Sequence, residues 1–207
     1  MKTYLFQGDS ITDASRVRDW DMSLGSGYAT TIASIIGTKY PGKINFINRG
    51  ISGNRIVDLY ARIKSDIINL KPDYLSILIG INDVWHELSY QNGVNAEKFE
   101  KVYSMLIEEI LEELPNIKIY ILEPFIGHGI ASDEHWDYFY SETRKRAKAA
   151  KRVADKYSLP FITLQDKFEK AEAEVSCTYW TSEGVHPSAM GHGIIANALM
   201  EVLEKDI

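Results

Sequence analysis

The chain has a single cysteine, no long apolar run and no excess of basic residues. With only Cys177 among 207 residues, an intramolecular disulfide and a cysteine-based metal cluster are both excluded. We expect Cys177 to be a buried or half-buried structural thiol. No apolar run approaches the roughly 18 residues that span a bilayer. The formal net charge of -6 disfavours nucleic acid and anionic membrane surfaces as partners.

The N-terminal segment also lacks the charged and apolar regions of a secretory signal, because Met1 to Phe6 leads directly into a strand pattern. We therefore expect a cytoplasmic protein. The length fits one domain over residues 1–207. A hydrophobic content of 45% and a charged content of 25% are ordinary for a globular chain.

Strand-like and helix-like segments alternate along the sequence. This alternation predicts an α/β fold, with one parallel sheet covered by helices on both faces. Two longer segments, residues 82–95 and 127–137, are predicted as loops at the edge of the sheet where ligands bind. The predicted strands are residues 3–7, 43–48, 74–79, 117–122 and 160–164; the predicted helices are residues 27–39, 56–70, 96–114, 136–157 and 189–204.

Polar or glycine-rich segments follow the first three predicted strands. In a parallel sheet the carboxyl ends of the strands share one edge, so we expect these segments to meet there. Ser10 follows strand one at a helix start, where the backbone N–H favours an oxyanion. Gly50 to Asn54 follows strand two, and Asn82 follows strand three with an amide that can donate to a negative oxygen. Each feature taken alone fits an ordinary helix cap or turn.

His186 lies near the C-terminus with Glu183 three residues before it. A serine hydroxyl needs a base to take its proton, and a carboxylate near Nδ1 orients that base. Ser10, His186 and Glu183 are thus candidates for a catalytic triad. The alternative is that Glu183 points to solvent and His186 works alone or with another acceptor.

These residues together resemble the SGNH hydrolases, also called GDSL esterases, in which Ser, Gly, Asn and His occur in four blocks in this order. The resemblance covers essentially the whole chain. It implies a three-layer α/β/α flavodoxin-like fold with a five-stranded parallel sheet and no metal or other cofactor. It makes Ser10 the nucleophile and His186 the general base, and it assigns the oxyanion hole to Ser10, Gly53 and Asn82.

A narrower likeness is to the bacterial acetylxylan-esterase group of that family. It implies removal of O-acetyl groups from xylose units of short oligosaccharides, and it allows self-association into a homo-oligomer. The family has Asp where this chain has Glu183, which makes the acid the least secure member of the set. The segments that carry the likeness are residues 8–13, 25–28, 49–54, 71–73, 79–85 and 185–192.

Three tryptophans are candidates for substrate binding. Trp85 and Trp180 lie close in sequence to Asn82 and to Glu183, so each is either a platform for a sugar ring or a packing residue. Trp20 lies in a loop-like stretch and is either a pocket residue or a subunit contact. The spacing of the histidines other than His186 does not match a compact metal site.

Two other functions remain open at this stage. The same machinery serves lysophospholipases and thioesterases, which act on other acyl substrates. A carbohydrate-binding protein of the same fold without catalysis is the rival from a different class, and the presence of all four block residues disfavours it.

Overall fold

The structure is a computed structural model that describes residues 1–207. Its centre is one five-stranded parallel sheet with the order β2-β1-β3-β4-β5, which is the flavodoxin-like order. The predicted sheet is therefore confirmed, although β5 is shorter than expected. The strands are β1 (Lys2–Gly8), β2 (Ile44–Asn48), β3 (Tyr74–Leu78), β4 (Lys118–Leu122) and β5 (Phe161–Ile162).

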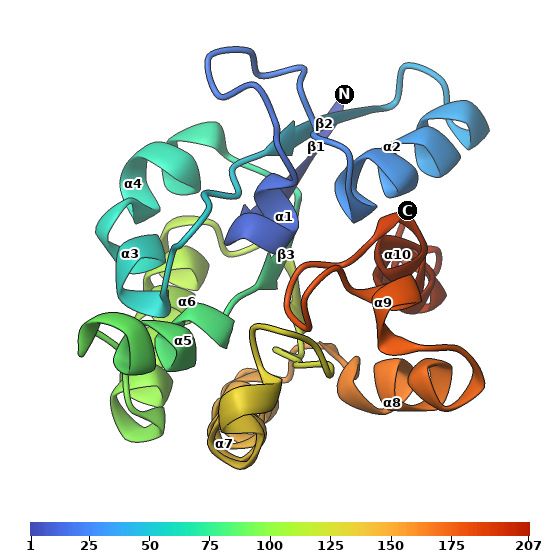
Figure 1. Cartoon of the computed structure of the whole chain (residues 1–207). Helices are drawn as coiled ribbons and strands as arrows, with labels where there is room; N and C mark the ends of the chain where they lie inside the picture. Colours follow the sequence, from blue (N-terminus) through green and yellow to red (C-terminus); the bar gives the residue numbers. More distant parts are fainter.

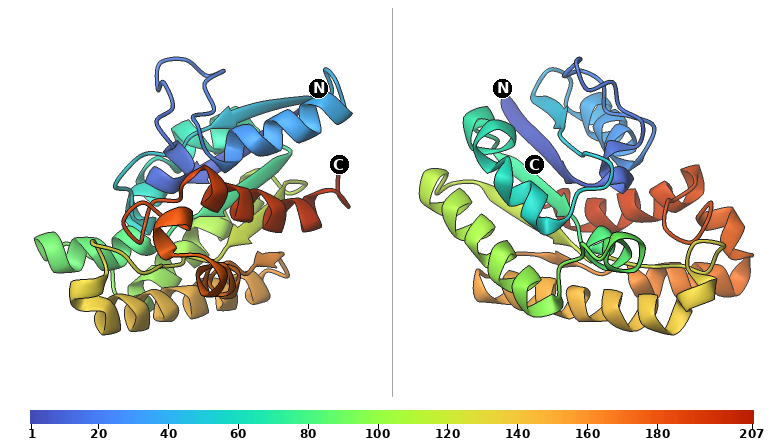
Figure 2. Two further views of the ribbon diagram at one scale, coloured as in Figure 1. Left: turned by 45° about the vertical axis from the view of Figure 1, so that its right-hand side comes forward. Right: turned by 60° about the vertical axis from the view of Figure 1, so that its left-hand side comes forward.

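Helices cover both faces of the sheet and complete three layers (Figure 1). The α2, α8 and α10 helices pack on one face, and the α3, α6 and α7 helices pack on the other. Figure 2 shows α2 and α10, from the two ends of the chain, lying side by side. The helices are α1 (Ser10–Asp13), α2 (Tyr28–Lys39), α3 (Ile56–Ala61), α4 (Ile63–Asp66), η1 (Ile68–Leu70), α5 (Ile81–Tyr90), α6 (Ala96–Glu113), η2 (Asp133–His135), α7 (Trp136–Lys156), α8 (Gln165–Glu174), α9 (Cys177–Trp180) and α10 (Ala189–Leu203).

The central strand β1 shows why the core divides in two. Successive side chains of a strand point to opposite faces. Tyr4 and Phe6 accordingly enter the core beneath α2 and α10, whereas Leu5 enters the core beneath α3 and α6. All three are fully buried, and each such side chain contributes about 1.5–3 kcal/mol of hydrophobic free energy. The strand that leads to Ser10 is therefore fixed from both sides.

The structure corrects three expectations from the sequence and largely confirms a fourth. The predicted loop at residues 82–95 contains α5, whose apolar residues Ile81, Val84 and Leu88 have helical spacing. The predicted helix at 56–70 is divided into α3, α4 and η1. The α8 and α9 helices were not predicted, because α8 buries only Gln165 and Phe168 and α9 buries no residue, so neither shows a clear apolar stripe. Residues 127–137 form a loop as predicted, apart from η2 and the start of α7.

The carboxyl ends of β1, β2 and β3 bring the predicted polar segments to one edge of the sheet. Arg49 N donates to the Phe6 carbonyl at 2.8 Å, and Ile51 N donates to the Gly8 carbonyl at 3.1 Å. The turn after β2 therefore runs beside the turn that carries Ser10. No helix of the chain has both the length and the apolar composition needed to cross a membrane.

Candidate active site

Ser10 is the first residue of the short helix α1, directly after β1. Asp9 caps this helix, because its carboxylate accepts a hydrogen bond from Ile11 N at 2.9 Å. Gly8 is required by close packing: a Cβ there would come within 2.3 Å of the Leu78 carbonyl oxygen and 2.4 Å of Thr12 Oγ1. Burial raises the pKa of the Asp9 carboxyl to about 7, against the opposing effects of the Ile11 amide and of His186.

Ser10, His186 and Glu183 form a continuous hydrogen-bonded row. Ser10 Oγ lies 2.8 Å from His186 Nε2, and His186 Nδ1 is hydrogen-bonded to Glu183 Oε1. Because the carboxylate can only accept, Nδ1 carries the proton and Nε2 is left to accept from the serine hydroxyl. The extra methylene of glutamate is thus accommodated in this geometry. The structure places Glu183 on the base and not in solvent.

The glutamate is itself held by its neighbours. The His186 backbone N–H donates to Glu183 Oε1 at 3.1 Å, and the Ser182 hydroxyl donates to Oε2. Ser182 N also donates to the His186 carbonyl at 2.9 Å, which closes the turn between them. Both carboxylate oxygens of Glu183 therefore accept hydrogen bonds from neighbouring groups. These bonds hold the side chain in the position where it accepts from the His186 imidazole.

The loop predicted at residues 127–137 supports the backbone of this turn. Ala131 N donates to the Glu183 carbonyl at 3.0 Å, and Gly127 N donates to the Gly184 carbonyl at 2.8 Å. A Cβ at Gly129 would come within 2.2 Å of the Glu183 carbonyl carbon. The loop approaches the acid so closely that only glycine fits at this point.

Three N–H donors face the region beside the serine hydroxyl. The backbone N–H groups of Ser10 and Gly53 have no acceptor within the protein. Asn82 Nδ2 donates one hydrogen to the Asn54 carbonyl at 3.1 Å, which fixes the amide and leaves its other hydrogen free. Ser10, Gly53 and Asn82 line one cavity of about 440 Å³ together with His186. The arrangement can stabilise an oxyanion formed at Ser10.

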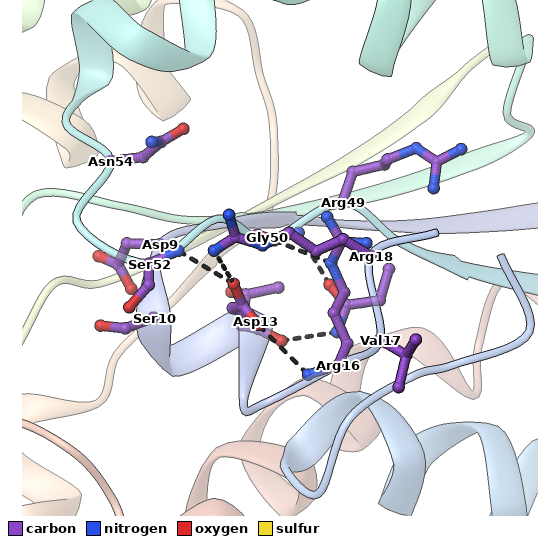
Figure 3. A network of polar contacts seen from close by, with 12 residues as sticks. Asp9, Ser10, Asp13, Arg16, Val17, Arg18, Arg49, Gly50, Ser52 and Asn54 are labelled. Atoms are coloured by element: carbon purple, nitrogen blue, oxygen red, sulfur yellow. Dashed lines mark hydrogen bonds and ion pairs between the residues drawn. The ribbon is translucent and has the colours of Figure 1, made fainter. Parts of the chain in front are cut away.

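Asp13 links the nucleophile helix to the turn that carries Gly53. One carboxylate oxygen accepts from Ser52 N at 3.1 Å and from Arg18 Nη2 at 2.8 Å, and the other accepts from Arg16 N at 3.2 Å. Figure 3 shows Asp13 at the centre of these contacts, one turn away from Ser10. Sequence reasoning missed this role, although Asp13 closes the first of the segments that carry the family resemblance.

Arg62 makes a second connection between the strand ends. Its guanidinium donates to Asn54 Oδ1 at 2.8 Å, to the Arg49 carbonyl at 2.9 Å and to the Gly8 carbonyl at 3.3 Å. An ion pair with Asp66 at 2.7 Å balances the charge. No motif identified Arg62, because its partners are far from it in sequence.

Asp83, the neighbour of Asn82, is buried, and its carboxylate accepts a hydrogen bond from Ile56 N at 3.2 Å. This contact holds the start of α3 against the start of α5. Burial raises the pKa of Asp83 well above its usual value. Its neighbour Asn82 is therefore set on a helix start that is tied to the rest of the strand-end region.

The three candidate tryptophans differ in their position relative to Ser10. Trp85 lines the 440 Å³ cavity, and its ring centroid lies 6.1 Å from that of His186. Trp180 packs elsewhere: its indole N–H donates to the Ala171 carbonyl at 2.9 Å, and it lines neither cavity that contains Ser10. Trp20 is 58% exposed and also lines neither cavity. Only Trp85 is brought to the site.

Residues of α5 that sequence reasoning missed complete the wall opposite Ser10. His86, Ser89 and Tyr90 line the same cavity as Trp85. They were overlooked because this segment was expected to be a loop. Cys177 is half-buried, and no group of three or more His, Cys, Asp and Glu side chains is arranged to hold a metal ion.

The sequence and the structure were compared with those of known proteins. Residues 6–194 match the GDSL-like Lipase/Acylhydrolase family. The chain is 32% identical over 206 residues to an acetylxylan esterase from Geobacillus stearothermophilus, covering 95% of this chain and 91% of that protein. It is 28% identical over 151 residues to the uncharacterized lipoprotein YqeF of Bacillus subtilis, covering 72% of this chain and 59% of that protein.

Solved structures give the same relationship. A putative GDSL-like lipase from Parabacteroides merdae superposes with a TM-score of 0.91 at 34% identity, covering 97% of this chain and 94% of that chain. An acetylxylan esterase from Geobacillus stearothermophilus superposes with a TM-score of 0.86 at 31% identity, covering 97% of this chain and 93% of that chain.

Proposed function

The chain belongs to the GDSL-like lipase/acylhydrolase family and is an esterase, and from that premise we propose that it removes O-acetyl groups from a carbohydrate such as an acetylated xylo-oligosaccharide. The likeness to an acetylxylan esterase supports the acetyl group and the sugar. Ser10 serves as nucleophile, His186 as general base and Glu183 as the acid that orients it.

The polar lining around Ser10 is the observation that carries the choice of substrate. Most side chains that line the two cavities on either side of the hydroxyl are charged, hydroxylic or imidazole groups. A fatty acyl chain gains its binding free energy from apolar walls, which these cavities offer only in part. A short acetyl group on a hydroxyl-rich sugar matches them better than the lipid chain of a lysophospholipid.

The geometry supports the following reaction as part of the proposal. His186 Nε2 takes the proton of Ser10 Oγ as this oxygen attacks the acetyl carbonyl carbon. The N–H groups of Ser10, Gly53 and Asn82 stabilise the resulting oxyanion. The carbon–oxygen bond to the sugar then breaks, and His186 returns its proton to the leaving sugar oxygen. Water, deprotonated by the same imidazole, attacks the acetyl-enzyme and releases acetate and free Ser10.

The test compares acyl length and sugar identity on one enzyme preparation. Initial rates are measured on acetylated xylo-oligosaccharides, on other acetylated sugars, and on nitrophenyl acetate and octanoate, with Ser10→Ala as the control. We expect kcat/KM to be highest on an acetylated sugar and to fall from acetate to octanoate. A rate that rises with acyl length contradicts the proposal in favour of a lipid or thioester substrate. Failure of an organophosphonate to label Ser10 contradicts catalysis altogether.

A further inference from the structure

A second cavity, of about 730 Å³, opens on the side of Ser10 away from Trp85. It shares Ser10, Ser52 and His186 with the smaller cavity, but its remaining wall differs. That wall carries charged and imidazole side chains in place of Gly53, Asn82 and Trp85. The additional lining residues are Ile11, Asp13, Ala14, Ser15, Arg16, Arg18, Ser26, Pro187, Ala189 and His192.

Arg16 is a buried cation in this wall without a carboxylate partner. The residue is only 8% exposed, and its one side-chain hydrogen bond runs from Nε to the Gly50 carbonyl at 2.9 Å. Asp13 receives the backbone N–H of Arg16, but the guanidinium that it binds is that of Arg18. Arg16 therefore lines the cavity, and its terminal nitrogens have no hydrogen-bond acceptor in the protein.

The other arginines of this region are balanced. Arg49 pairs with Asp21 at 2.6 Å, and Arg62 pairs with Asp66 at 2.7 Å. Burial lowers the pKa of Arg16, and the charges of Arg49 and Arg62 add to that effect while Asp13 opposes it. Buried charges are normally paired, because an isolated one is costly to desolvate. One positive charge in this cavity is therefore left without a counter-charge.

His192 adds a neutral donor to the same cavity. Its Nδ1 accepts from Tyr28 N at 3.2 Å, so the ring hydrogen lies on Nε2, which has no partner in the protein. The residue is only 8% exposed. Burial, with a smaller contribution from the charge of His186, lowers the pKa of His192 to about 4 and keeps it neutral. Gly27 allows this placement, since a Cβ there would lie 2.7 Å from the ring.

We propose that this cavity is an anion subsite in which Arg16 and His192 bind a carboxylate carried by the substrate. Resting on the proposed deacetylase function, this identifies the substrate class as an acetylated oligosaccharide with a uronic acid residue near the acetylated sugar. A planar guanidinium with free terminal nitrogens matches a carboxylate in charge and in geometry. The subsite adjoins Ser10, so the carboxylate helps to fix the ester beside the nucleophile.

The experiment measures kcat/KM on a matched pair of acetylated xylo-oligosaccharides, one neutral and one with a glucuronic acid side group. The ratio of the two values is determined for the native enzyme, for Arg16→Gln and for Arg152→Gln. Arg152 is the control, an exposed arginine on α7 that pairs with Glu100. We expect the native enzyme to favour the acidic substrate by about tenfold or more, because charge-assisted hydrogen bonds are the strong ones. Arg16→Gln is expected to bring the ratio near one, and Arg152→Gln to leave it unchanged.

Two further measurements keep the result interpretable. Arg16→Lys retains the positive charge but lacks the paired nitrogens of the guanidinium, so it should keep part of the preference for the acidic substrate. The thermal midpoint of each variant shows whether it is folded. Inorganic phosphate is tested as a competitive inhibitor. If phosphate inhibits but the native enzyme does not prefer the acidic substrate, the subsite does not bind a substrate carboxylate. A preference for the acidic substrate that survives in Arg16→Gln overturns the proposal as well. Hydrolysis of the neutral substrate by the native enzyme supports the proposed function in either case, and its absence counts against that function instead.

Discussion

Ser10 is set on the end of a central strand, whereas His186 lies on a loop and its side chain is 42% exposed. The nucleophile side is fixed by long-range contacts: Asp13 reaches Ser52, and Arg62 reaches the carbonyls of Gly8 and Arg49. The base is fixed by contacts within residues 182–187 and by the loop at 127–131.

This difference predicts that substitutions on the two sides of the site affect stability and reaction rate differently. Contacts around Ser10 are part of the core, so their loss should weaken the fold together with the reaction. The side-chain contacts of Glu183 lie within residues 182–186, so their loss should slow the reaction and leave the fold nearly intact. The predictions below test this contrast.

The largest effect is expected from Glu183→Gln. An amide at this position can donate to Nδ1 and so favours the wrong tautomer of His186, which costs about 10⁴ in kcat in a comparable triad. The thermal midpoint should change little, because the side chain of Glu183 makes hydrogen bonds only within residues 182–186. Steady-state kinetics on an acetyl ester and a melting curve measure both quantities. A near-unchanged kcat would remove Glu183 from the catalytic row.

Asn82→Ala should lower kcat by about 10²–10³, as expected for the loss of one oxyanion donor. The amide also holds the Asn54 carbonyl, so a moderate loss of stability should accompany the slower reaction. Asn54→Ala serves as the comparison, because it keeps that carbonyl and the oxyanion amide and removes only the Arg62 contact. Equal kcat values for the two variants would argue against an oxyanion role.

Asp13→Asn should reduce both stability and rate. The change removes the charge that binds Arg18 and weakens the acceptor for Ser52 N, at a cost of about 1–3 kcal/mol in the free energy of unfolding. Because Ser52 precedes Gly53, kcat should fall as well. Denaturant unfolding and kinetics on the same sample test this. Normal stability with reduced kcat would show that the nucleophile side is not coupled to the fold in this way.

Asp9→Asn should change how stability depends on pH. The folded protein holds a proton on Asp9 up to about pH 7, whereas the unfolded chain releases it near its ordinary pKa of 3.8. The folded state therefore binds more protons between these values, and the native free energy of unfolding falls as pH rises through that window. The asparagine variant lacks this term and should gain about 4 kcal/mol relative to the native protein between pH 4 and pH 8, since each pKa unit corresponds to about 1.4 kcal/mol. Parallel pH curves from denaturant unfolding would contradict the buried carboxyl.

The smallest effect is expected from Ser182→Ala. Loss of its hydroxyl leaves Glu183 Oε2 without that donor, so kcat should fall by roughly threefold to tenfold, about the value of one hydrogen bond. Stability should be unchanged within about 0.5 kcal/mol. The pH–rate profile provides the check, since a less firmly held carboxylate should shift its acid limb. A drop in the melting temperature without a kinetic effect would reverse the assignment of this contact.

The sheet and the central catalytic residues could be predicted because their signals are local. Apolar strands end at Gly8 and near Gly80, and the short polar segments that follow them must share one edge of a parallel sheet. Ser10 and Asn82 were predicted as site residues in this way, whereas His186 was predicted from the family resemblance and from Glu183 three residues before it. Glu183 could be predicted from its spacing to His186. How a side chain longer than the family's Asp fits beside the imidazole could not, because it depends on contacts with Ser182 and with the loop at 127–131.

The remaining parts of the site could not be predicted, because their contact partners are distant in the sequence or because the local sequence pattern fits more than one structure. The α5 helix has helical apolar spacing, but Asn82 and Asp83 at its start favoured a turn, so the wall formed by Trp85 and Tyr90 was read as a loop. Trp180 is adjacent to the acid segment in sequence, yet its indole turns toward α8. Side-chain direction of this kind is decided by packing.

Ser10 and His186 are separated by 176 residues along the chain. On a ribosome Ser10 emerges first and remains without its hydrogen-bond partner until His186 has been synthesised. A fragment that ends before His186 is therefore inert toward esters however well its sheet has formed. The onset of ester hydrolysis during refolding reports the closing of the longest-range contact of the site, and it marks completion of the fold.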